Sequence, residues 1–368
     1  MRGTASSYWR HFDFLLLGAV ALLVIIGITM IRSAIAGNID VADYDQRQLI
    51  FALIGFVVIL AATAIDYHLW ASLSRGLYIF TVLVLGVLFV VGTAVLGSAR
   101  WFEVGVLFIQ PSEIAKITLI IVLANFFSRR QNQEIDLKLI FRSFLLTLGI
   151  VGWIILQPNL STSIVMIVIW FAMLWASGLG WKHLLMLLGV SVVVPIVTYP
   201  LFPDYQKQRV LNFIFPDPTA THGETYNILQ ALISIGTGGW LGQGYLQGSQ
   251  VQLRFLKVRW SDFIFSAFAQ EFGFVGTIVI MALLLFVIFR CLRAARLSRD
   301  TFGALIAYGV ATMIASQAIV NIGVNLNLLP ATGITLPFVS YGGSSLLSLL
   351  IGIGLVESVI LRQKSLEF

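Results

Sequence analysis

Long apolar runs alternate with short polar or charged segments along almost the whole chain. The runs reach about 20 residues, which is the length that an α-helix needs to cross the ~30 Å hydrocarbon core of a bilayer. We therefore predict ten membrane-spanning helices, at 13–34, 49–66, 76–97, 112–128, 139–156, 160–177, 183–201, 263–289, 302–327 and 336–360. The fourth is the least regular, because Glu113 and Lys116 fall in its first turns.

The composition supports the same fold class. Of 368 residues, 58% are hydrophobic and 11% are charged, whereas soluble domains carry about 25% charged residues. The single Cys291 excludes an intramolecular disulfide, and the four histidines have no metal-ligand spacing. We predict an all-α polytopic membrane protein that forms a single integral membrane domain over residues 1–368.

The distribution of charge orients the predicted bundle. With the N-terminus inside, the inside segments hold 14 of the 23 Lys and Arg residues, and the short outside loops carry little beyond Arg47 and Arg100. Cytoplasmic loops of membrane proteins carry such an excess, so we predict that both termini are cytoplasmic. The net charge of +6 then reflects topology and does not indicate nucleic-acid binding.

One long connection, about 202–262, falls on the outer side. Loops of this length in compact proteins tend to be functional. Apolar residues at helical spacing from Tyr226 to Ile235 predict a short helix at the membrane surface. Six glycines within 236–250 predict a shaped loop packed onto the bundle. The same connection contains basic residues, which would bind lipid head groups or an anionic substrate such as a pyrophosphate: Lys207, Arg209, Arg254, Lys257 and Arg259.

Two acids stand at and within the eighth predicted span. Asp262 lies at its outer end, and Glu271 follows nine residues later. A carboxylate inside a span is expensive and marks a functional site by default. Asp262 could equally cap the helix, since its side chain would favour the free N–H groups of the first turn. Spacing alone leaves both interpretations open.

A second polar cluster opens the fourth span. Glu113 and Lys116 are three residues apart, so they share one helical face. They either neutralise each other or line a polar cavity, and the cavity is favoured because intramembrane charges usually face an interior space. Pro111 suits the first turn of this helix, and Gln110 or Ser112 could satisfy its free N–H groups.

The last two spans also carry polar residues. Gln317, Asn321 and Asn325 share a face of the ninth span, either as interhelical hydrogen-bond partners or, less often, as cavity-lining groups. In 329–345, Pro337 could kink or start a helix, and Gly342 and Gly343 precede Ser344 and Ser345. This is either an anion site at a helix N-terminus facing a cavity or a kinked span with small residues at a packing interface.

Several short motifs together resemble the SEDS family (shape, elongation, division and sporulation) of bacterial cell-wall glycosyltransferases. They occur in the family's order from about residue 13 onward: RWF at 100–102, QPSEIAK at 110–116, QPNLST at 157–162, YQKQR at 205–209, DP at 217–218, YNILQ at 226–230, IGTGGWLGQG at 235–244, DFIF at 262–265, EFG at 271–273 and TGITLPFVSYGGSS at 332–345. The RHFDFLLL start and the Gly-Ser-Gln run of the outer loop favour the RodA branch over the FtsW branch.

The chain departs from the family pattern in three places. Asn159 and Ser161 stand where Asp and Gly are common, and Gln270 stands where a Glu is usual. The segment KVRWS replaces the Pro-Glu pair and Thr that usually precede the motif aspartate, which makes the surroundings of Asp262 more basic. Glu271 is then left as a lone acid, which favours a structural role for it.

The resemblance implies polymerisation of lipid II into glycan strands at the outer face of the bacterial cytoplasmic membrane, in cell elongation and shape. Asp262 is the expected general base, undecaprenyl pyrophosphate the leaving group, and inversion the expected stereochemical outcome. Burial would raise the pKa of Asp262, and Arg259 or Lys257 nearby would lower it. The residues expected to contact substrate or line the cavity are Arg100, Gln110, Glu113, Lys116, Arg209, Lys257, Arg259, Asn321, Ser340, Ser344 and Ser345.

The resemblance also implies partners and alternatives. We expect a class B penicillin-binding protein as a cross-linking partner, lipid II as substrate, contacts with membrane lipids, and neither nucleic acid nor nucleotide. The nucleotide motif GxxxxGK[ST] is absent from the sequence. A divalent cation, Mg²⁺ or Mn²⁺, is a candidate cofactor for the pyrophosphate. A lipid II flippase and a non-catalytic scaffold are the competing functions; a flippase needs charges near the midplane, whereas a polymerase needs its base at the outer face.

Overall fold

The computed structural model describes residues 11–92, 102–104, 107–131, 134–217 and 219–363. Ten long helices in these ranges correspond to the ten predicted spans: α2 (Phe14–Ile35), α3 (Tyr44–Ala64), α4 (Tyr67–Gly92), α5 (Pro111–Ser128), α6 (Leu137–Leu156), α7 (Leu160–Ala176), α8 (Trp181–Thr198), α12 (Ile264–Leu297), α13 (Thr301–Asn325) and α14 (Gly343–Leu361). Nine of them are long and apolar enough to cross a membrane, and α7 is shorter at 17 residues. The protein is a multi-pass membrane protein, as predicted.

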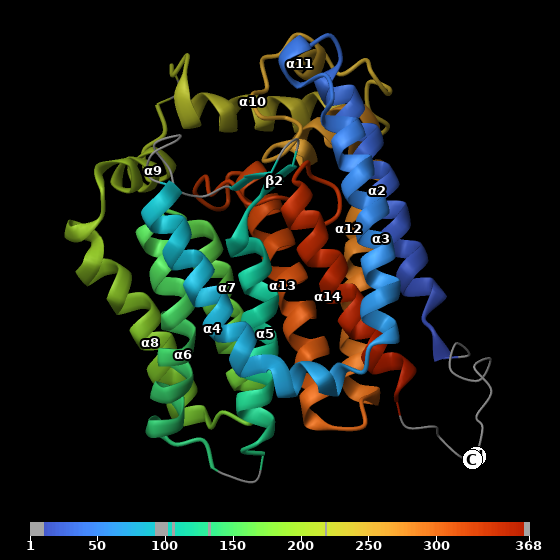
Figure 1. The fold of residues 1–368 in the computed structure, drawn as a ribbon. Coiled ribbons are helices and arrows are strands. Elements are labelled where there is room, and N and C mark those ends of the chain that lie inside the picture. The colour runs from blue at the N-terminus through green and yellow to red at the C-terminus, as the bar shows by residue number, and fades with distance from the viewer. Residues whose placement is uncertain (1–10, 93–101, 105–106, 132–133, 218, 364–368) are drawn as a thin grey trace.

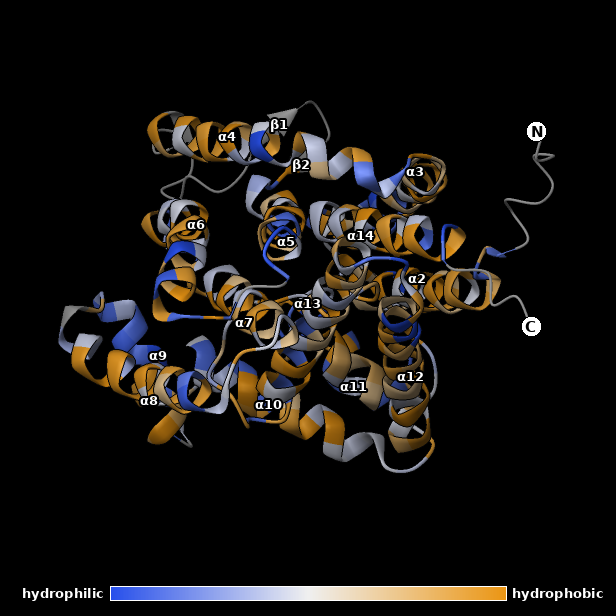
Figure 2. Ribbon diagram, turned by 90° about the horizontal axis from the view of Figure 1, so that it is seen from below, coloured by the Kyte–Doolittle hydropathy of each residue, from blue (hydrophilic) through white to orange (hydrophobic). Residues whose placement is uncertain are grey.

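The long helices form an upright bundle (Figure 1). Seen along the bundle, α13 lies near the centre, among α5, α7, α12 and α14 (Figure 2). The helices α14 and α5 are mostly buried, whereas almost all of α8 is exposed at the edge of the bundle. The start of α2 and the end of α14 lie at the end of the bundle opposite α10, and the Asp13 backbone N–H donates to Glu357 across them (Figure 1). The cytoplasmic position of this end remains a prediction.

Polar residues in the short connections start several of these helices. The side chains of Asp13, Asp136 and Asp300 each accept a hydrogen bond from a backbone N–H of the following first turn, at 3.0, 2.8 and 2.7 Å. Such caps satisfy N–H groups that have no intrahelical partner. The same residues that interrupt the apolar pattern therefore fix where α2, α6 and α13 begin.

The outer connection contains more helices than predicted. The predicted surface helix at Tyr226–Ile235 is present within α10 (Gly223–Gly238), which runs across the end of the bundle (Figure 1). Two further helices, α9 (Asp204–Ile214) and α11 (Ser249–Gln252), flank it. Beside them the short antiparallel strands β1 (Phe102–Val104) and β2 (Leu107–Ile109) pair before α5. The α9 helix buries none of its residues.

Three predicted boundaries are wrong by seven residues or more. The α12 helix continues to Leu297, eight residues beyond the predicted end at 289. The α4 helix begins at Tyr67, nine residues before the predicted start at 76, because its first turns are amphipathic and run across the end of the bundle before the helix rises (Figure 1). The last span was predicted from residue 336, but α14 begins at Gly343. Residues 336–342, including Pro337, form a non-helical turn whose backbone groups bind side chains of other segments. Pro337 therefore neither starts nor kinks a helix.

The glycine-rich loop docks onto a break in α12. The helix is interrupted at Gly273, where φ is 67°, which favours glycine. The carbonyls of Gln270 and Glu271 accept from the N–H groups of Gln243 and Gly244, at 2.9 and 3.0 Å. Beyond the break, the N–H groups of residues 274 and 275 donate to the carbonyls of residues 239 and 240. The loop therefore satisfies the backbone groups that the break leaves unpaired. The expectation of a loop packed onto the bundle is confirmed.

Candidate active site

Asp262 lies just before α12, at the end of the bundle that carries α10. It does not cap the helix: the N-cap residue is Phe263, and the Ser266 N–H of the first turn donates to Asn325 Oδ1 of α13 at 3.1 Å. The capping interpretation is therefore wrong. Asp262 Oδ1 instead accepts a hydrogen bond from Ser261 Oγ at 2.8 Å. Oδ2 faces the loop before α14, since a methyl group on Gly333 would lie 3.5 Å from it. The partly exposed carboxylate is thus free of a helix-capping role.

The backbone around Asp262 is held from two other elements. Two amides of α13, Asn321 Nδ2 and Asn325 Nδ2, donate to the Asp262 carbonyl at 3.0 and 2.9 Å. From the turn before α14, Ser340 Oγ donates to the Ser261 carbonyl at 2.7 Å, and the Tyr341 N–H donates to the Trp260 carbonyl at 2.9 Å. Fixing three successive carbonyls leaves little freedom in the direction of the Asp262 side chain.

The Asp262 carboxyl is shifted toward its protonated form. Burial raises the pKa of this carboxyl, and the Ser261 hydrogen bond and the positive charge of Arg209 offset part of the rise. Arg209 reaches the site from α9 and forms an ion pair with Glu224 of α10, with 2.8 Å between Nε and Oε1. The expectation that Arg259 or Lys257 supplies the lowering charge is wrong, because the acting cation comes from a helix some fifty positions away.

Glu113 and Lys116 form a buried ion pair in the first turns of α5. Lys116 Nζ lies 2.8 Å from Glu113 Oε2, and the lysine side chain is only 1% exposed. Ser348 of α14 approaches the same carboxylate oxygen at 3.4 Å. The charges neutralise each other inside the bundle, where α5 meets α14. That they line a polar cavity stays a prediction.

The starts of α5 and α14 lie side by side. The Gln110 N–H, at the start of α5, donates to Ser344 Oγ at 2.9 Å, and Ser345 Oγ lies 2.9 Å from Thr335 Oγ1. Ser112 Oγ, one residue into α5, is buried and has no hydrogen-bond partner in the part of the chain that the structure describes. Two helix N-termini with free donors make an environment that favours an anion.

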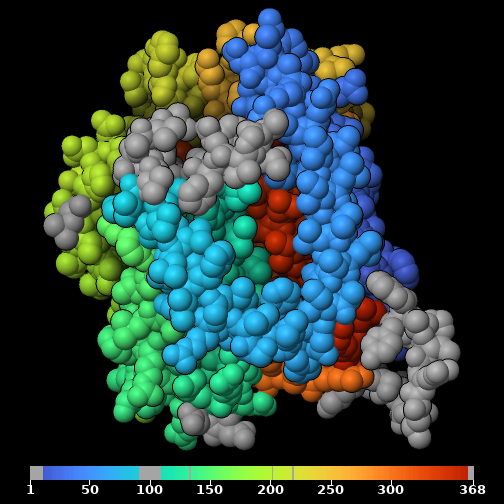
Figure 3. Space-filling view, viewed as in Figure 1, coloured from blue at the N-terminus to red at the C-terminus, as the bar shows by residue number. Residues whose placement is uncertain are grey.

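The segment 329–342 connects these groups to Asp262. Its Ile334 carbonyl accepts from Asn321 Nδ2 at 2.7 Å, and its Thr335 contacts Ser345. On the surface, the bundle is hollowed between α3 and α4, and α14 is visible at the bottom of the hollow (Figure 3). Glu113, Lys116, Ser344 and Ser345 lie along the contact between α5 and α14. The two predicted polar clusters are therefore parts of one region, linked through a single loop.

Two predicted site residues, Lys257 and Arg259, are not joined to this region, and a third lies outside the described residues. Lys257 is exposed on the outer surface. Arg259 is 3% exposed: its Nη1 donates to the Leu256 carbonyl, its guanidinium lies over the Trp260 ring, and its Nε has no partner among the described residues. Arg100 lies outside the described residues. Glu271 accepts a short hydrogen bond from Ser33 Oγ of α2, as its predicted structural role requires.

Sequence reasoning missed residues that act on the backbone of the site. Gln48, in α3, is 1% exposed and bonds the backbone of residues 340 and 342. In the sequence, Gln48 is only a polar residue next to a predicted span, and many helix ends have such a residue. Asn325 was noticed only as one of three amides on a helix face, and Ser261 only as part of a departure from a motif. Gln48 and Asn325 bond backbone groups far away in the sequence, and the Ser261 carbonyl accepts from the distant Ser340.

The described residues offer no metal cage of their own. No group of three or more His, Cys, Asp or Glu side chains in these ranges could hold an ion. Mg²⁺ commonly binds through one or two carboxylates together with substrate phosphates. The predicted cation would therefore have to be carried mainly by a pyrophosphate, and no step of the chemistry is assigned to it.

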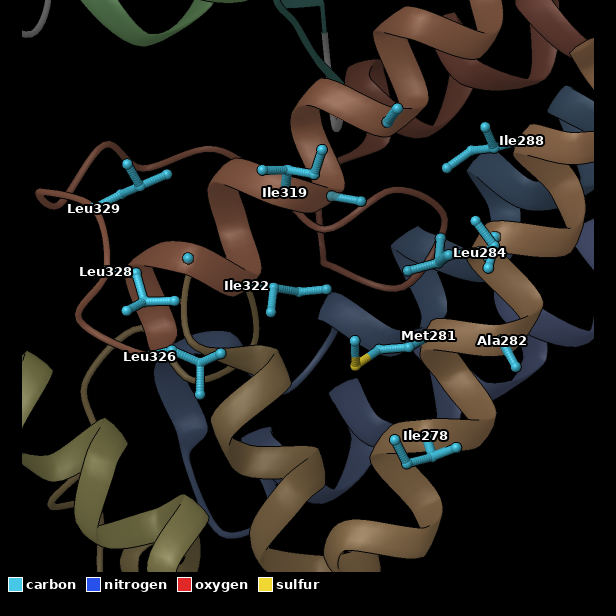
Figure 4. Close-up of a pocket in the computed structure, with 14 residues that line it drawn as sticks. Ile278, Met281, Ala282, Leu284, Ile288, Ile319, Ile322, Leu326, Leu328 and Leu329 are labelled. Atoms are coloured by element: carbon cyan, nitrogen blue, oxygen red, sulfur yellow. The ribbon is translucent and has the colours of Figure 1, made fainter.

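An apolar groove lies between α12 and α13 and is lined by apolar residues. It encloses about 730 Å³. Side chains of both helices point into it, among them Ile278, Met281, Leu284, Ile319 and Ile322, and Leu328 and Leu329 close one end (Figure 4). A lining of this kind cannot bind sugars or phosphates by hydrogen bonds, so it fits an apolar chain or helix.

Comparisons with known proteins agree with this geometry. Residues 11–365 match the family described as cell cycle protein, FtsW/RodA/SpoVE. The peptidoglycan glycosyltransferase MrdB of Escherichia coli strain K12 is 36% identical over 374 aligned residues, which cover 98% of this chain and 97% of that protein.

Two solved structures share the fold. One is a chain from a peptidoglycan synthase complex that coordinates polymerization and crosslinking; its TM-score is 0.82 at 31% identity, covering 96% of this chain and 99% of that one. The other is the rod shape determining protein RodA of Thermus thermophilus, with a TM-score of 0.72 at 29% identity, covering 97% and 99%. The family predicted from the motifs is confirmed: the chain belongs to the FtsW/RodA/SpoVE family of cell cycle proteins, the SEDS family.

Proposed function

We propose that the protein is a peptidoglycan glycosyltransferase of the RodA type, which polymerises lipid II at the outer face of the bacterial cytoplasmic membrane during cell elongation. The observation that carries this proposal is the Asp262 carboxylate: it is partly exposed and does not cap a helix, and the backbone that carries it is held by hydrogen bonds from two other elements. A polymerase needs such a group on the side of the outer loop, where a sugar can reach it.

Asp262 acts as the general base. A carboxylate whose pKa lies above the ordinary aspartate range is a better proton acceptor than an exposed aspartate. It takes the proton of the acceptor sugar's hydroxyl group as that oxygen attacks the anomeric carbon of the donor. The bond from this carbon to the pyrophosphate oxygen breaks on the opposite side, so the configuration inverts. The products are one new glycosidic bond and undecaprenyl pyrophosphate.

The leaving pyrophosphate needs charge stabilisation more than protonation. The adjoining starts of α5 and α14, with the buried donor Ser112 Oγ, offer N–H and O–H groups for this purpose. Lys116 lies one turn further into α5, paired with Glu113. Arg209 stands on the other side of Asp262, and its partner Glu224 keeps it in place. The hollow between α3 and α4 gives the lipid chain of the substrate a lateral route from the bilayer (Figure 3).

The cross-linking partner is proposed to be a class B penicillin-binding protein. The similar chain from a peptidoglycan synthase complex supports such a partner. The groove between α12 and α13 is lined by apolar residues and by none of the polar clusters, so it can receive an apolar helix of that partner without blocking the substrate (Figure 4). This arrangement would leave Asp262 accessible in the assembled complex.

Purified protein with purified lipid II tests the proposal, with product chains resolved on a gel in the presence and absence of divalent cation and partner. Asp262→Asn keeps the shape of the side chain and removes the base, so we expect loss of polymerisation by a folded protein. General-base catalysis contributes about 10²–10⁴-fold, which sets the expected loss.

Asp136→Asn is the matched control, because Asp136 is an acid at the start of α6 whose cap an asparagine can preserve. A folded Asp262→Asn protein that polymerises at the normal rate would rule out Asp262 as the general base. A wild-type protein that moved lipid II across vesicles without polymerising it would support the flippase alternative, and one that did neither would support the scaffold.

A further inference from the structure

Gln48 is a buried polar residue on α3 that the proposed reaction does not use. Its side chain is 1% exposed, and both ends of its amide are occupied by backbone groups of one turn. Nε2 donates to the Ser340 carbonyl at 3.1 Å, and Oε1 accepts from the Gly342 N–H at 3.2 Å. A glutamine is one of the few side chains that can donate and accept at the same time over this span. It therefore fixes the position of residues 340–342 relative to α3.

Neighbouring residues on the same face of α3 hold the same turn. Tyr44, one turn before Gln48, stacks its ring on that of Tyr341, with 4.1 Å between centroids and 4° between planes. Phe51, one turn after it, lies against Gly343, where a methyl group would come within 2.2 Å of the phenyl ring. Three side chains at helical spacing thus press one side of the turn against α3.

The opposite side of this turn holds the segment that carries Asp262. Ser340 Oγ donates to the Ser261 carbonyl, and the Tyr341 N–H donates to the Trp260 carbonyl. Ser340 Oγ also accepts from the Leu336 N–H at 2.8 Å, which closes the turn on itself. A displacement of residues 340–342 would be passed directly to Trp260 and Ser261, and so to the Asp262 carboxylate.

From these contacts we infer that Gln48 is a positioning residue for Asp262, acting through the turn 340–342. The inference rests on the proposed function, because it assigns α3 a part in directing the base of that reaction. Gln48 touches neither the substrate nor the reacting atoms. It sets where the backbone of Ser340 lies, and Ser340 sets where Ser261 and Asp262 lie. Small displacements of a catalytic group have large effects on rate, about 10²-fold for 1 Å.

Gln48→Met tests the inference, because methionine matches glutamine in length and volume and cannot form the two hydrogen bonds. The matched control is Thr63→Val, at the other end of the same helix pair. Thr63 is fully buried and donates to the Ile59 and Gly354 carbonyls at 2.7 and 3.4 Å, so valine removes a buried α3–α14 contact far from Asp262. Both purified proteins are assayed for lipid II polymerisation, alongside wild type and Asp262→Asn, and for thermal unfolding.

We expect Gln48→Met to lower kcat by about tenfold or more, with the apparent KM for lipid II within about twofold of wild type. Thr63→Val should keep kcat within about twofold. The double variant Gln48→Met with Ser340→Ala should lose no more than the worse single variant, since both act on one geometry and coupled residues are not additive. Effects that multiply would show two independent roles and contradict the inference.

Other outcomes would also overturn it. A Gln48→Met protein with wild-type kcat, alongside an inactive Asp262→Asn protein, refutes the positioning role and leaves the proposed function standing. If Gln48→Met and Thr63→Val lost kcat equally, and in proportion to their losses in melting temperature, the effect of Gln48→Met would be one of stability and not of positioning. An Asp262→Asn protein that still polymerises at the normal rate would refute Asp262 as the base, and its positioning with it, while the polymerase activity itself would stand.

Discussion

Removing one member of the Glu113–Lys116 ion pair should destabilise the protein strongly. Lys116→Met keeps the apolar stem of the side chain and deletes its charge. The Glu113 carboxylate, 8% exposed, would then keep only Ser348 at 3.4 Å, a weak hydrogen bond. Breaking a buried ion pair from one side costs about 3–5 kcal/mol, because it leaves an uncompensated buried charge. The 2.8 Å contact and the 1% exposure of Lys116 place this pair within the range to which that figure applies.

The double variant Glu113→Gln with Lys116→Met separates stability from function. The double variant leaves no uncompensated buried charge, and replacing a buried pair by hydrophobic side chains of similar volume is often neutral or stabilising. Most of the lost stability should therefore return, with a coupling energy of about 3 kcal/mol. Unfolding in mixed detergent micelles, followed by tryptophan fluorescence, measures the free energies. Polymerisation by the same samples measures function. If the pair serves the substrate, the double variant will be stable and still impaired.

A second buried pair provides the control. Arg290 and Asp13 join α12 to the start of α2 at the opposite end of the bundle. Asp13→Asn with Arg290→Met can retain the cap on Leu16, and it should leave the polymerisation rate of the folded protein unchanged. Our reasoning would be refuted if Lys116→Met unfolded like wild type, or if the double variant were as unstable as either single one.

Two further predictions concern the base and the groove. Asp262 must be ionised to accept a proton, and burial raises its pKa, so kcat should fall as the pH drops through a midpoint above the ordinary aspartate range. Ser261→Ala and Arg209→Gln each remove one of the two interactions that lower this pKa. The midpoint of the kcat–pH profile should therefore move to higher pH in both variants. A shift to lower pH would be evidence against Asp262 as the base. For the groove, Ile319→Cys (Ile319 is 66% exposed) should form a disulfide with a cysteine in the partner's apolar helix, whereas Phe80→Cys on α4 (Phe80 is 65% exposed) should not; equal cross-linking would exclude the groove as a specific contact.

Features that depend on local composition were predictable. The apolar runs gave the ten long helices within a few residues in most cases, because crossing a bilayer requires a length of apolar sequence that nothing else in the chain mimics. The start of α4 was predicted wrongly, because its first turns are amphipathic and do not form part of an apolar run. Glu113 and Lys116 could be paired in advance because residues three apart on a helix are neighbours whatever surrounds them.

Features of the site that depend on distant residues were not predictable. Asp262 was identified from its position between a long loop and a span, but its role as a helix cap was excluded only by the observed start of α12. The cation beside it was expected from adjacent sequence, yet it comes from α9. No periodicity relates Arg209 to Asp262, and charges in a loop can meet in many ways.

The sequence by itself determined that this is a membrane bundle with an acid next to a long loop and a second charged cluster in a span, because helix length, periodicity and charge are local properties. Only the tertiary structure decided the position and direction of the Asp262 side chain. Gln48 and Ser340 are 292 positions apart, and Asn325 and the Asp262 carbonyl are 63 apart. Such hydrogen bonds exist only once α3, α13 and the turn before α14 have packed together, since a buried amide finds its partner in whichever backbone the packing brings to it.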